Sequence, residues 1–159
     1  MGQLNNPVIV EREVGGRKLT IEAGRFAKQA NGSVLIRYGE TVALVTAVCA
    51  KTESNFDFFP LTIEFQEKFY SVGRIPGGFF KKEARPTEWA TLNARMVDRP
   101  LRPLFPETFR RETQVVFTLL SYDGENEVES IAGLGASAAL YISDMPVYDS
   151  DCHRASWKS

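Results

Sequence analysis

The strongest constraint on the fold is an uninterrupted apolar run at residues 41–50, TVALVTAVCA. Most of its residues are β-branched or small, and apolar side chains occupy both alternating sets of positions. A strand with one wet face would alternate with polar residues, so this run predicts a central strand covered on both sides. Residues 33–38 precede it across Gly39-Glu40, and a glycine in the first turn position permits a type II′ hairpin.

Further strands are predicted on both sides of this run. Residues 8–10 and 19–21 alternate apolar with polar side chains, and the glycine pair at 15–16 favours a tight hairpin between them. Residues 61–66, LTIEFQ, also alternate and predict a strand with one wet face. The first part of the chain is therefore expected to be antiparallel β-structure.

Helices are expected in the second part of the chain. A helix is predicted at residues 87–99, ended by Pro100, because proline disfavours helix at the residue before it. Residues 114–121, QVVFTLLS, predict a second buried strand, and residues 131–142 predict a helix rich in Gly and Ala. This order indicates an α+β fold. The apolar stripe of the first helix is expected at Trp89, Leu92 and Met96.

Arginines gather on and after this first helix. At about 100° per residue, Arg95 and Arg99 lie about 40° apart and are expected to border the apolar stripe. Arg102 follows just beyond Pro100. Guanidinium groups match phosphate oxygens, so these arginines could hold a phosphate or a nucleic-acid backbone. The alternative is that Asp98 forms a structural salt bridge with Arg95 or Arg102.

A loop at residues 71–85 contains GGFFKKEAR, which Pro86 follows, and has no apolar periodicity. Phe79 and Phe80 could stack on bases while Lys81 and Lys82 meet phosphates. The alternative is that one phenylalanine enters the core and the lysines are ordinary surface charge. Local chemistry leaves both interpretations open.

Composition and charge restrict the function classes. The net charge is −1, but residues 74–111 hold nine basic and four acidic residues, which indicates either an anion site or an ordinary solvated surface. No run is long and apolar enough to span a bilayer, and no signal peptide is apparent, so we expect a cytoplasmic protein without membrane contact. Cys49, Cys152 and the single His153 have no metal-site spacing, so no metal is expected to be bound by this chain.

A dinucleotide-type pattern, GxGxxA, occurs at residues 133–138. A dinucleotide turn must link a strand to a helix, and the preceding GENEVES does not read as a strand. We therefore interpret these small residues as a helix surface that packs closely on the sheet.

Several stretches in order resemble a known family. They are IEAGRFAKQANGSVLIRYGETVALVTAV, GGFFKKEARPTE, ARMVDRPLRPLFPETFR, QVVFTLL and AGLGASAALYISDMP. Together they resemble the first RNase PH-like core of the polynucleotide phosphorylase family, over about residues 7–146. The resemblance implies an RNase PH-like core, also described as ribosomal protein S5 domain 2-like. It further implies the N-terminal part of a phosphorolytic 3′-to-5′ exoribonuclease, a polyribonucleotide nucleotidyltransferase that degrades RNA to nucleoside diphosphates.

The resemblance also implies roles for the residues singled out above. The family's aromatic–basic loop guards the neck of a channel, and its positions here are Phe79, Phe80, Lys81 and Lys82. The family commonly has two arginines where these lysines stand, and lysine keeps the charge without the fork. The family's arginine-rich helix faces the catalytic pocket, which implies supporting contacts with RNA or phosphate. The matching residues are Arg95, Arg99 and Arg102.

Family members are homotrimers that act on single-stranded RNA, use inorganic phosphate and Mg²⁺ or Mn²⁺, and join partners in RNA-decay complexes. Their metal ligands and catalytic lysine belong mostly to a second core. We therefore expect no catalytic or metal-binding residue in this chain, and no activity from it alone.

The end of the chain departs from the family. Residues 147–159 resemble nothing in it, so we expect a partial domain at 7–146, incomplete at its C-terminus, followed by a divergent tail. The missing strands would leave an unpaired sheet edge and exposed apolar surface. Alternatives to an RNA-guiding enzyme part are a non-catalytic RNA-binding or assembly module and an inactive truncation product.

Overall fold

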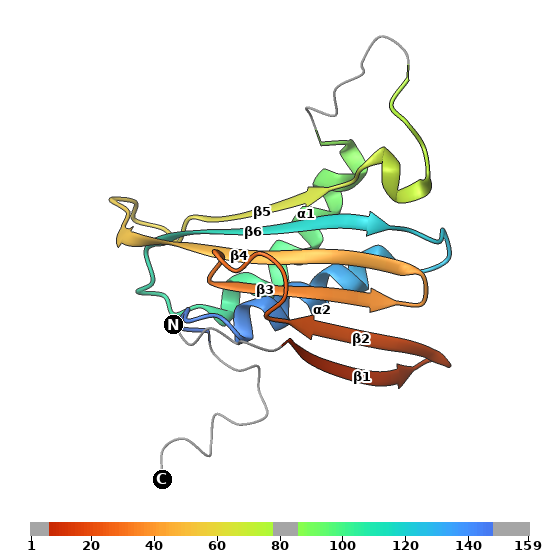
Figure 1. Ribbon diagram of the computed structural model, residues 1–159. Helices are drawn as coiled ribbons and strands as arrows, with labels where there is room; N and C mark the ends of the chain where they lie inside the picture. Colours follow the sequence, from red (N-terminus) through yellow and green to blue (C-terminus); the bar gives the residue numbers. More distant parts are fainter. Residues whose placement is uncertain (1–6, 78–85, 148–159) are drawn as a thin grey trace.

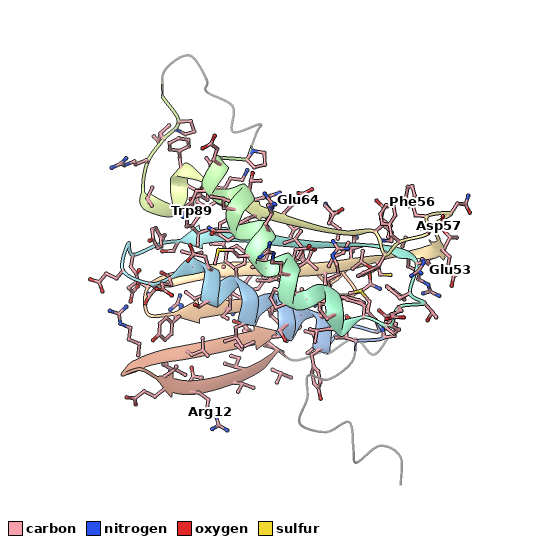
Figure 2. All side chains as sticks on the ribbon, turned by 180° about the vertical axis from the view of Figure 1, so that it is seen from behind. Arg12, Glu53, Phe56, Asp57, Glu64 and Trp89 are labelled. Atoms are coloured by element: carbon pink, nitrogen blue, oxygen red, sulfur yellow. The ribbon has the colours of Figure 1, made fainter. Side chains whose placement is uncertain are left out.

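The computed structural model describes residues 7–77 and 86–147. Within these residues one mixed six-stranded sheet carries two α-helices on one face, which confirms the α+β class (Figures 1 and 2). The strands are β1 (Val8–Val14), β2 (Arg17–Ala23), β3 (Gly32–Tyr38), β4 (Thr41–Glu53), β5 (Leu61–Gln66) and β6 (Arg111–Ser121). The helices are α1 (Glu88–Leu101) and α2 (Val128–Tyr141), and the 3₁₀ turns are η1 (Phe69–Val72) and η2 (Arg102–Leu104).

β4 is a central strand, as the apolar run predicts. The sheet order is β1-β2-β3-β4-β6-β5, and β4 pairs antiparallel with β3 and β6. Its residues Thr41, Ala43, Val45 and Ala47 are fully buried, and Val45 lies against Gly135 of α2, so this set faces the helices. Val48, on the opposite face, is 44% exposed. The prediction that both faces of this strand are covered is therefore wrong for the described part of the chain.

Neighbouring strands supply part of the burial on the open face. Leu44 lies directly opposite Leu35 of β3, and both side chains are half-buried. Cross-strand pairs of this kind stabilise a sheet without a covering layer. The apolar residues on this side of β4 are therefore sheltered within the sheet plane, which is why their pattern looked like that of a strand buried on both faces.

Glycines form the turns of both predicted hairpins. Gly15 and Gly16 have φ angles of +58° and +75°, as a type I′ turn between β1 and β2 requires. Gly39 has φ +60°, whereas Glu40 is not among the residues with positive φ. This combination agrees with the type II′ turn expected between β3 and β4.

β5 is an edge strand that pairs only with β6, and this pairing is parallel. Parallel neighbours need a crossover connection, and α1 provides it between the two strands. The other edge is β1, whose residues are all exposed, including Val8, Ile9, Val10 and Val14. No helix in the described residues is long and apolar enough to cross a membrane.

Small residues bring α2 close to the sheet. A Cβ atom at Gly135 would lie 2.8 Å from Val45 Cγ2, and one at Gly32 of β3 would lie 2.0 Å from the Ala139 carbonyl oxygen. The GxGxxA pattern at residues 133–138 lies inside α2, so its interpretation as a packing surface is confirmed. The buried face of α2 includes Ala132, Gly135, Ala136 and Ala139.

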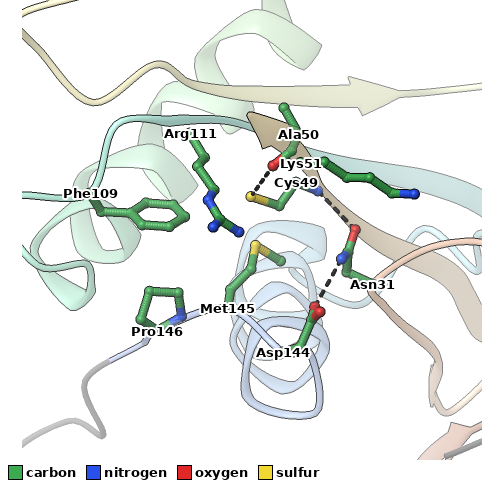
Figure 3. Close-up of a pocket in the computed structure, with 9 residues that line it drawn as sticks. All are labelled: Asn31, Cys49, Ala50, Lys51, Phe109, Arg111, Asp144, Met145 and Pro146. Carbon is green, nitrogen blue, oxygen red and sulfur yellow. Dashed lines mark hydrogen bonds between the residues drawn. The ribbon is translucent and has the colours of Figure 1, made fainter. Parts of the chain in front are cut away.

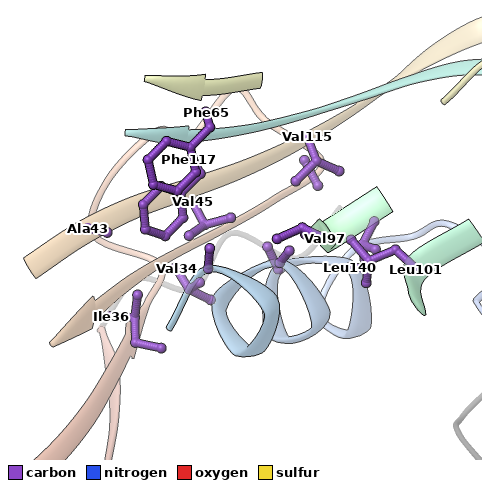
Figure 4. Close-up of a cluster of buried hydrophobic side chains, with 14 of the residues drawn as sticks. Val34, Ile36, Ala43, Val45, Phe65, Val97, Leu101, Val115, Phe117 and Leu140 are labelled. Carbon is purple, nitrogen blue, oxygen red and sulfur yellow. The ribbon is translucent and has the colours of Figure 1, made fainter. Parts of the chain in front are cut away.

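The core lies between the helices and the sheet (Figure 4). Phe65 of β5 and Phe117 of β6 are register partners, and their rings stack with centroids 4.5 Å apart. Val97 and Leu101 enter from α1, and Leu140 enters from α2. Both helices therefore contribute to one continuous core.

We predict that Gly32→Ala lowers the free energy of unfolding by about 1–3 kcal/mol, because the new methyl group must displace the backbone of α2. Thermal or urea unfolding followed by circular dichroism measures the change. Gly133→Ala is the matched control, since nothing lies within 4 Å of its Cβ position. That variant should gain about 0.5–1 kcal/mol from helix propensity. Equal stability of the two variants would contradict the close approach of α2.

Asp123 holds the turn that precedes α2. Its carboxylate accepts hydrogen bonds from the backbone N–H groups of Glu125 (3.0 Å) and Asn126 (3.2 Å). Burial alone would raise the pKa of Asp123, but these bonds, and others from the Thr41 side chain and the Glu40 backbone, outweigh it. The pKa of Asp123 is therefore lower than its ordinary value.

A lowered carboxyl pKa in the folded state stabilises the fold above the unfolded-state pKa of about 3.9, and this contribution is lost as the pH falls through the folded pKa. We predict that Asp123→Asn is less stable than the parent at pH 7 and that the difference shrinks below about pH 4. Urea titrations between pH 7 and pH 2 measure it. A difference that stays constant over this range would count against the carboxylate.

Candidate nucleic-acid interface

The start of α1 is fixed by a side-chain cap. Thr87 Oγ1 accepts a hydrogen bond from the Ala90 N–H (3.0 Å) and donates one to Glu67 (2.8 Å). Threonine is a common N-cap because its oxygen satisfies an otherwise unpaired helix N–H. The cap sets the first turn of α1 immediately after residues 78–85, which lie outside the described residues.

The end of α1 lies beyond the predicted position. The helix was expected to end at Arg99, but it continues through Pro100 to Leu101. A proline this close to the C-terminus removes only one late hydrogen bond. The buried Leu101 side chain holds the last turn, and the Arg102 N–H still bonds to the Asp98 carbonyl.

The apolar stripe of α1 is not the predicted one. Leu92 and Met96 are 57% and 60% exposed, and Trp89 is only partly buried. The buried residues are Ala90, Asn93, Val97 and Leu101. On the helical wheel this buried face lies about 110° from the predicted stripe. The prediction is wrong because the contact face uses small and polar residues close to the sheet, while larger apolar side chains face outward.

This rotation changes the setting of Arg95 and Arg99. Both are exposed and lie about 160° from the centre of the buried face, so they stand on the outward surface and not at the edge of the contact. They are separated by about 40° around the helix and by about 6 Å along it. Neither side chain has a hydrogen-bond or ion-pair partner within the part of the chain that the structure describes. Two adjacent guanidinium groups are thus available to an anion.

Arg102 has a different environment. Its Nε and Nη2 donate to the two carboxylate oxygens of Asp98, at 3.2 and 2.9 Å. Its Nη1 donates to the Phe59 carbonyl (3.0 Å), and Nη2 also donates to the Leu61 carbonyl (3.4 Å). The alternative salt bridge between Asp98 and Arg102 is therefore present. The two carbonyl contacts have no signal in the sequence, because the acceptors belong to backbone about 40 residues away.

The aromatic–basic loop cannot be placed. Phe79, Phe80, Lys81 and Lys82 lie outside the described residues, so their predicted roles stay predictions. What the structure does fix is the connection: the loop leaves the end of β5 through η1 and enters α1 at its N-cap. The loop is therefore tethered to the helix that carries Arg95 and Arg99.

A second exposed aromatic feature was missed by sequence reasoning. Phe56 and Phe58 stack with centroids 5.2 Å apart on the loop before β5, and both are exposed (Figure 2). This loop and the 78–85 segment attach to opposite ends of β5. Glu53 and Asp57 lie near Phe56 in Figure 2, and Arg111 is the register partner of Glu53, so acidic and basic groups are mixed at this end of the sheet.

The described residues also enclose a pocket of about 160 Å³ beside the end of β4 (Figure 3). Asn31 spans one side of it, accepting a hydrogen bond from the Cys49 N–H (2.9 Å) and donating to Asp144 (2.8 Å). Cys49 is partly buried and packs against the core. The hydrogen bonds of Asn31 therefore connect the residue before β3 with β4 and with the turn after α2.

Metal ligands are not grouped in this part of the protein. Among the described residues, no three His, Cys, Asp or Glu side chains are close enough to hold a metal ion. The guanidinium groups of Arg95 and Arg99, which have no partner among the described residues, have the donor geometry that suits phosphate oxygens.

Comparison with known proteins identifies what the chain is similar to. Residues 15–146 match the 3′ exoribonuclease family, domain 1. The polyribonucleotide nucleotidyltransferase of Desulforamulus reducens is 56% identical over 143 residues, which cover 90% of this chain and 19% of that protein. The enzyme of the same name from Sorangium cellulosum is 59% identical over 133 residues, covering 84% of this chain and 18% of that protein. The chain thus spans about a fifth of the length of these curated relatives.

Solved structures share the fold at low identity. A chain of the Archaeoglobus fulgidus exosome with RNA bound to the active site aligns with a TM-score of 0.51 and 20% identity, covering 87% of this chain and 51% of that one. Rice Rrp46 aligns with a TM-score of 0.54 and 15% identity, covering 91% of this chain and 59% of that one. These likenesses confirm the RNase PH-like fold.

Proposed function

Because this chain belongs to the 3′ exoribonuclease family, domain 1, we propose that it is the RNA-guiding first RNase PH-like domain of a polyribonucleotide nucleotidyltransferase. The activity of such an enzyme is phosphorolysis, in which inorganic phosphate attacks the terminal phosphodiester of RNA and releases a nucleoside diphosphate. In this proposal the domain binds the RNA strand, and a second core supplies most of the chemistry. The domain boundaries at 7–146, with a distinct tail at 147–159, are part of the same proposal.

The observation that carries the proposal is the outward pair Arg95 and Arg99 on α1. Exposed guanidinium groups one helical turn apart, without protein partners in the described residues, favour contact with successive oxygens of an RNA backbone or a phosphate ion. The exposed Leu92 and Met96 beside them add apolar surface for a ribose or base. Arg102 adds no support to this proposal, because most of its N–H donors already have acceptors within the protein. Its contact with RNA therefore stays a prediction.

The loop before α1 extends this surface in the proposal. Phe79 and Phe80 would stack on bases, and Lys81 and Lys82 would meet phosphates, in a manner that tolerates any RNA sequence. The tether between the loop and α1 supports this arrangement, because a strand that passes the loop can continue along the arginine face.

The remaining features of the proposal concern the complete enzyme. We propose single-stranded RNA and inorganic phosphate as its substrates, mRNA breakdown in the cytoplasm as its setting, and a homotrimer as its assembly, with RNA-decay partners around it. Mg²⁺ or Mn²⁺ would be held by the second core, since the described residues of this chain offer no ligand group. The chain's own part is to bind and orient the RNA strand.

We predict that Arg95→Ala combined with Arg99→Ala weakens binding of a fluorescent poly(A) oligomer. The slope of the logarithm of affinity against the logarithm of salt concentration should fall by the amount that about two phosphate contacts contribute. Fluorescence anisotropy at several salt concentrations measures both quantities. Arg12→Ala is the matched control, because Arg12 is also exposed but lies on the edge strand β1 (Figure 2). Equal losses in the two variants would indicate a general charge effect and contradict the proposed site.

We predict that Phe79→Ala combined with Phe80→Ala weakens the same binding by about 1–3 kcal/mol for each stacked base, with little change in the salt dependence. The control is Phe56→Ala with Phe58→Ala, which removes an exposed aromatic pair at the opposite end of β5. If the loop variant bound RNA as tightly as the parent, the loop would not be a stacking platform.

A further inference from the structure

We propose that Asp98 and Arg102 are positioning residues that fix the arginine face of α1 and keep Arg95 free for RNA. This inference rests on the proposed function and assigns Arg102 a role other than direct contact with RNA. It follows from the acceptors that surround the Arg102 guanidinium.

Arg102 connects α1 to β5. Arg102 bonds to the carboxylate of Asp98 in the last turns of α1 and to the carbonyls of Phe59 and Leu61 at the start of β5. Four of the five guanidinium N–H donors are thereby used. A forked cation that bridges a helix and a strand restricts rotation of the helix more than a single contact does.

The N-terminal end of α1 is also attached to β5. Trp89, in the first turn of α1, packs edge-to-face on Phe65 near the end of β5, with ring centroids 5.3 Å apart. The Thr87 side chain donates to Glu67 just beyond the same strand. α1 is therefore attached to β5 at both ends, and Arg102 is the polar attachment at the C-terminal end. With both ends fixed, Arg95 and Arg99 must face outward.

The negative charge of Asp98 could also pair with Arg95. Asp98 stands three residues after Arg95, a spacing at which helical side chains of opposite charge pair. In the structure the carboxylate bonds to Arg102 instead, with both oxygens engaged. Arg102 thus occupies the one nearby acidic group of α1 that could otherwise neutralise Arg95.

Two variants separate positioning from contact. Asp98→Asn removes a negative charge and releases Arg102, so direct contact by Arg102 predicts tighter RNA binding with a steeper salt dependence. Positioning predicts the reverse, a loss of about threefold or more in affinity, because the C-terminal attachment loosens. Arg102→Lys keeps the charge but loses the fork. If Arg102 is a positioning residue, the lysine variant binds RNA more weakly than the parent. If Arg102 contacts RNA directly, the lysine variant binds nearly as tightly as the parent.

Binding of the poly(A) oligomer by the 159-residue chain is measured by anisotropy for both variants, with Arg12→Lys on the exposed edge strand β1 as the control that should retain its affinity. Amide hydrogen exchange of the last turn of α1 is measured in parallel. Weaker binding of RNA and faster exchange of the last turn of α1 in both variants support the proposal. Tighter binding by Asp98→Asn, or unchanged exchange in both variants, overturns it.

The exchange measurement also separates this proposal from the proposed function. If exchange accelerates in both variants while the Arg95→Ala and Arg99→Ala protein still binds RNA normally, the helix is positioned as inferred, but its arginine face is not the RNA site. That result overturns the link to RNA and leaves the attachment of α1 established.

Discussion

The close approach of α2 to the sheet is the contact on which the other positions depend. Gly32 and Gly135 leave no room for a side chain, so the helix backbone lies directly against β3 and β4. A larger residue at either position would move α2 away from the sheet and open the core. α1 packs beside α2 on the same face, so the distance of α2 from the sheet also sets the space that α1 can occupy.

The crossover from β5 through α1 to β6 then determines which side of α1 faces outward. β5 and β6 are parallel neighbours, so a crossover must connect them, and α1 makes this crossover while packing on β5 and beside α2. The buried face is formed by Ala90, Asn93, Val97 and Leu101. Asn93 shows how closely this face is packed, since its Nδ2 is buried without a hydrogen-bond partner in the described residues. Such a group costs free energy, so its position is imposed by the surrounding packing.

Strands were predictable where alternation and glycine turns agreed. The runs around residues 8–21, 33–50, 61–66 and 114–121 all form strands, although β4 and β6 extend further than predicted. The face of α1 was not predictable from hydrophobicity, because Leu92 and Met96 suggest a stripe and Asn93 argues against the real one. The hydrophobic pattern records which residues are apolar, but the crossover geometry decides which of them are buried.

The two arginines of α1 and Arg102 just after it show the same limit at the level of the site. Arg95, Arg99 and Arg102 share one residue type, one short segment and one basic stretch, so sequence alone treats them alike. The structure separates them by the acceptors within reach: Arg102 meets Asp98, the carbonyl of Phe59 before β5 and the carbonyl of Leu61 in β5, while the other two meet none in the described residues. Backbone carbonyls carry no residue-specific signal, so contacts to them are invisible in any motif. The Arg102 guanidinium joins the end of α1 to the backbone at Phe59, and in our proposal this attachment leaves Arg95 and Arg99, which have no acceptor among the described residues, to an anionic ligand.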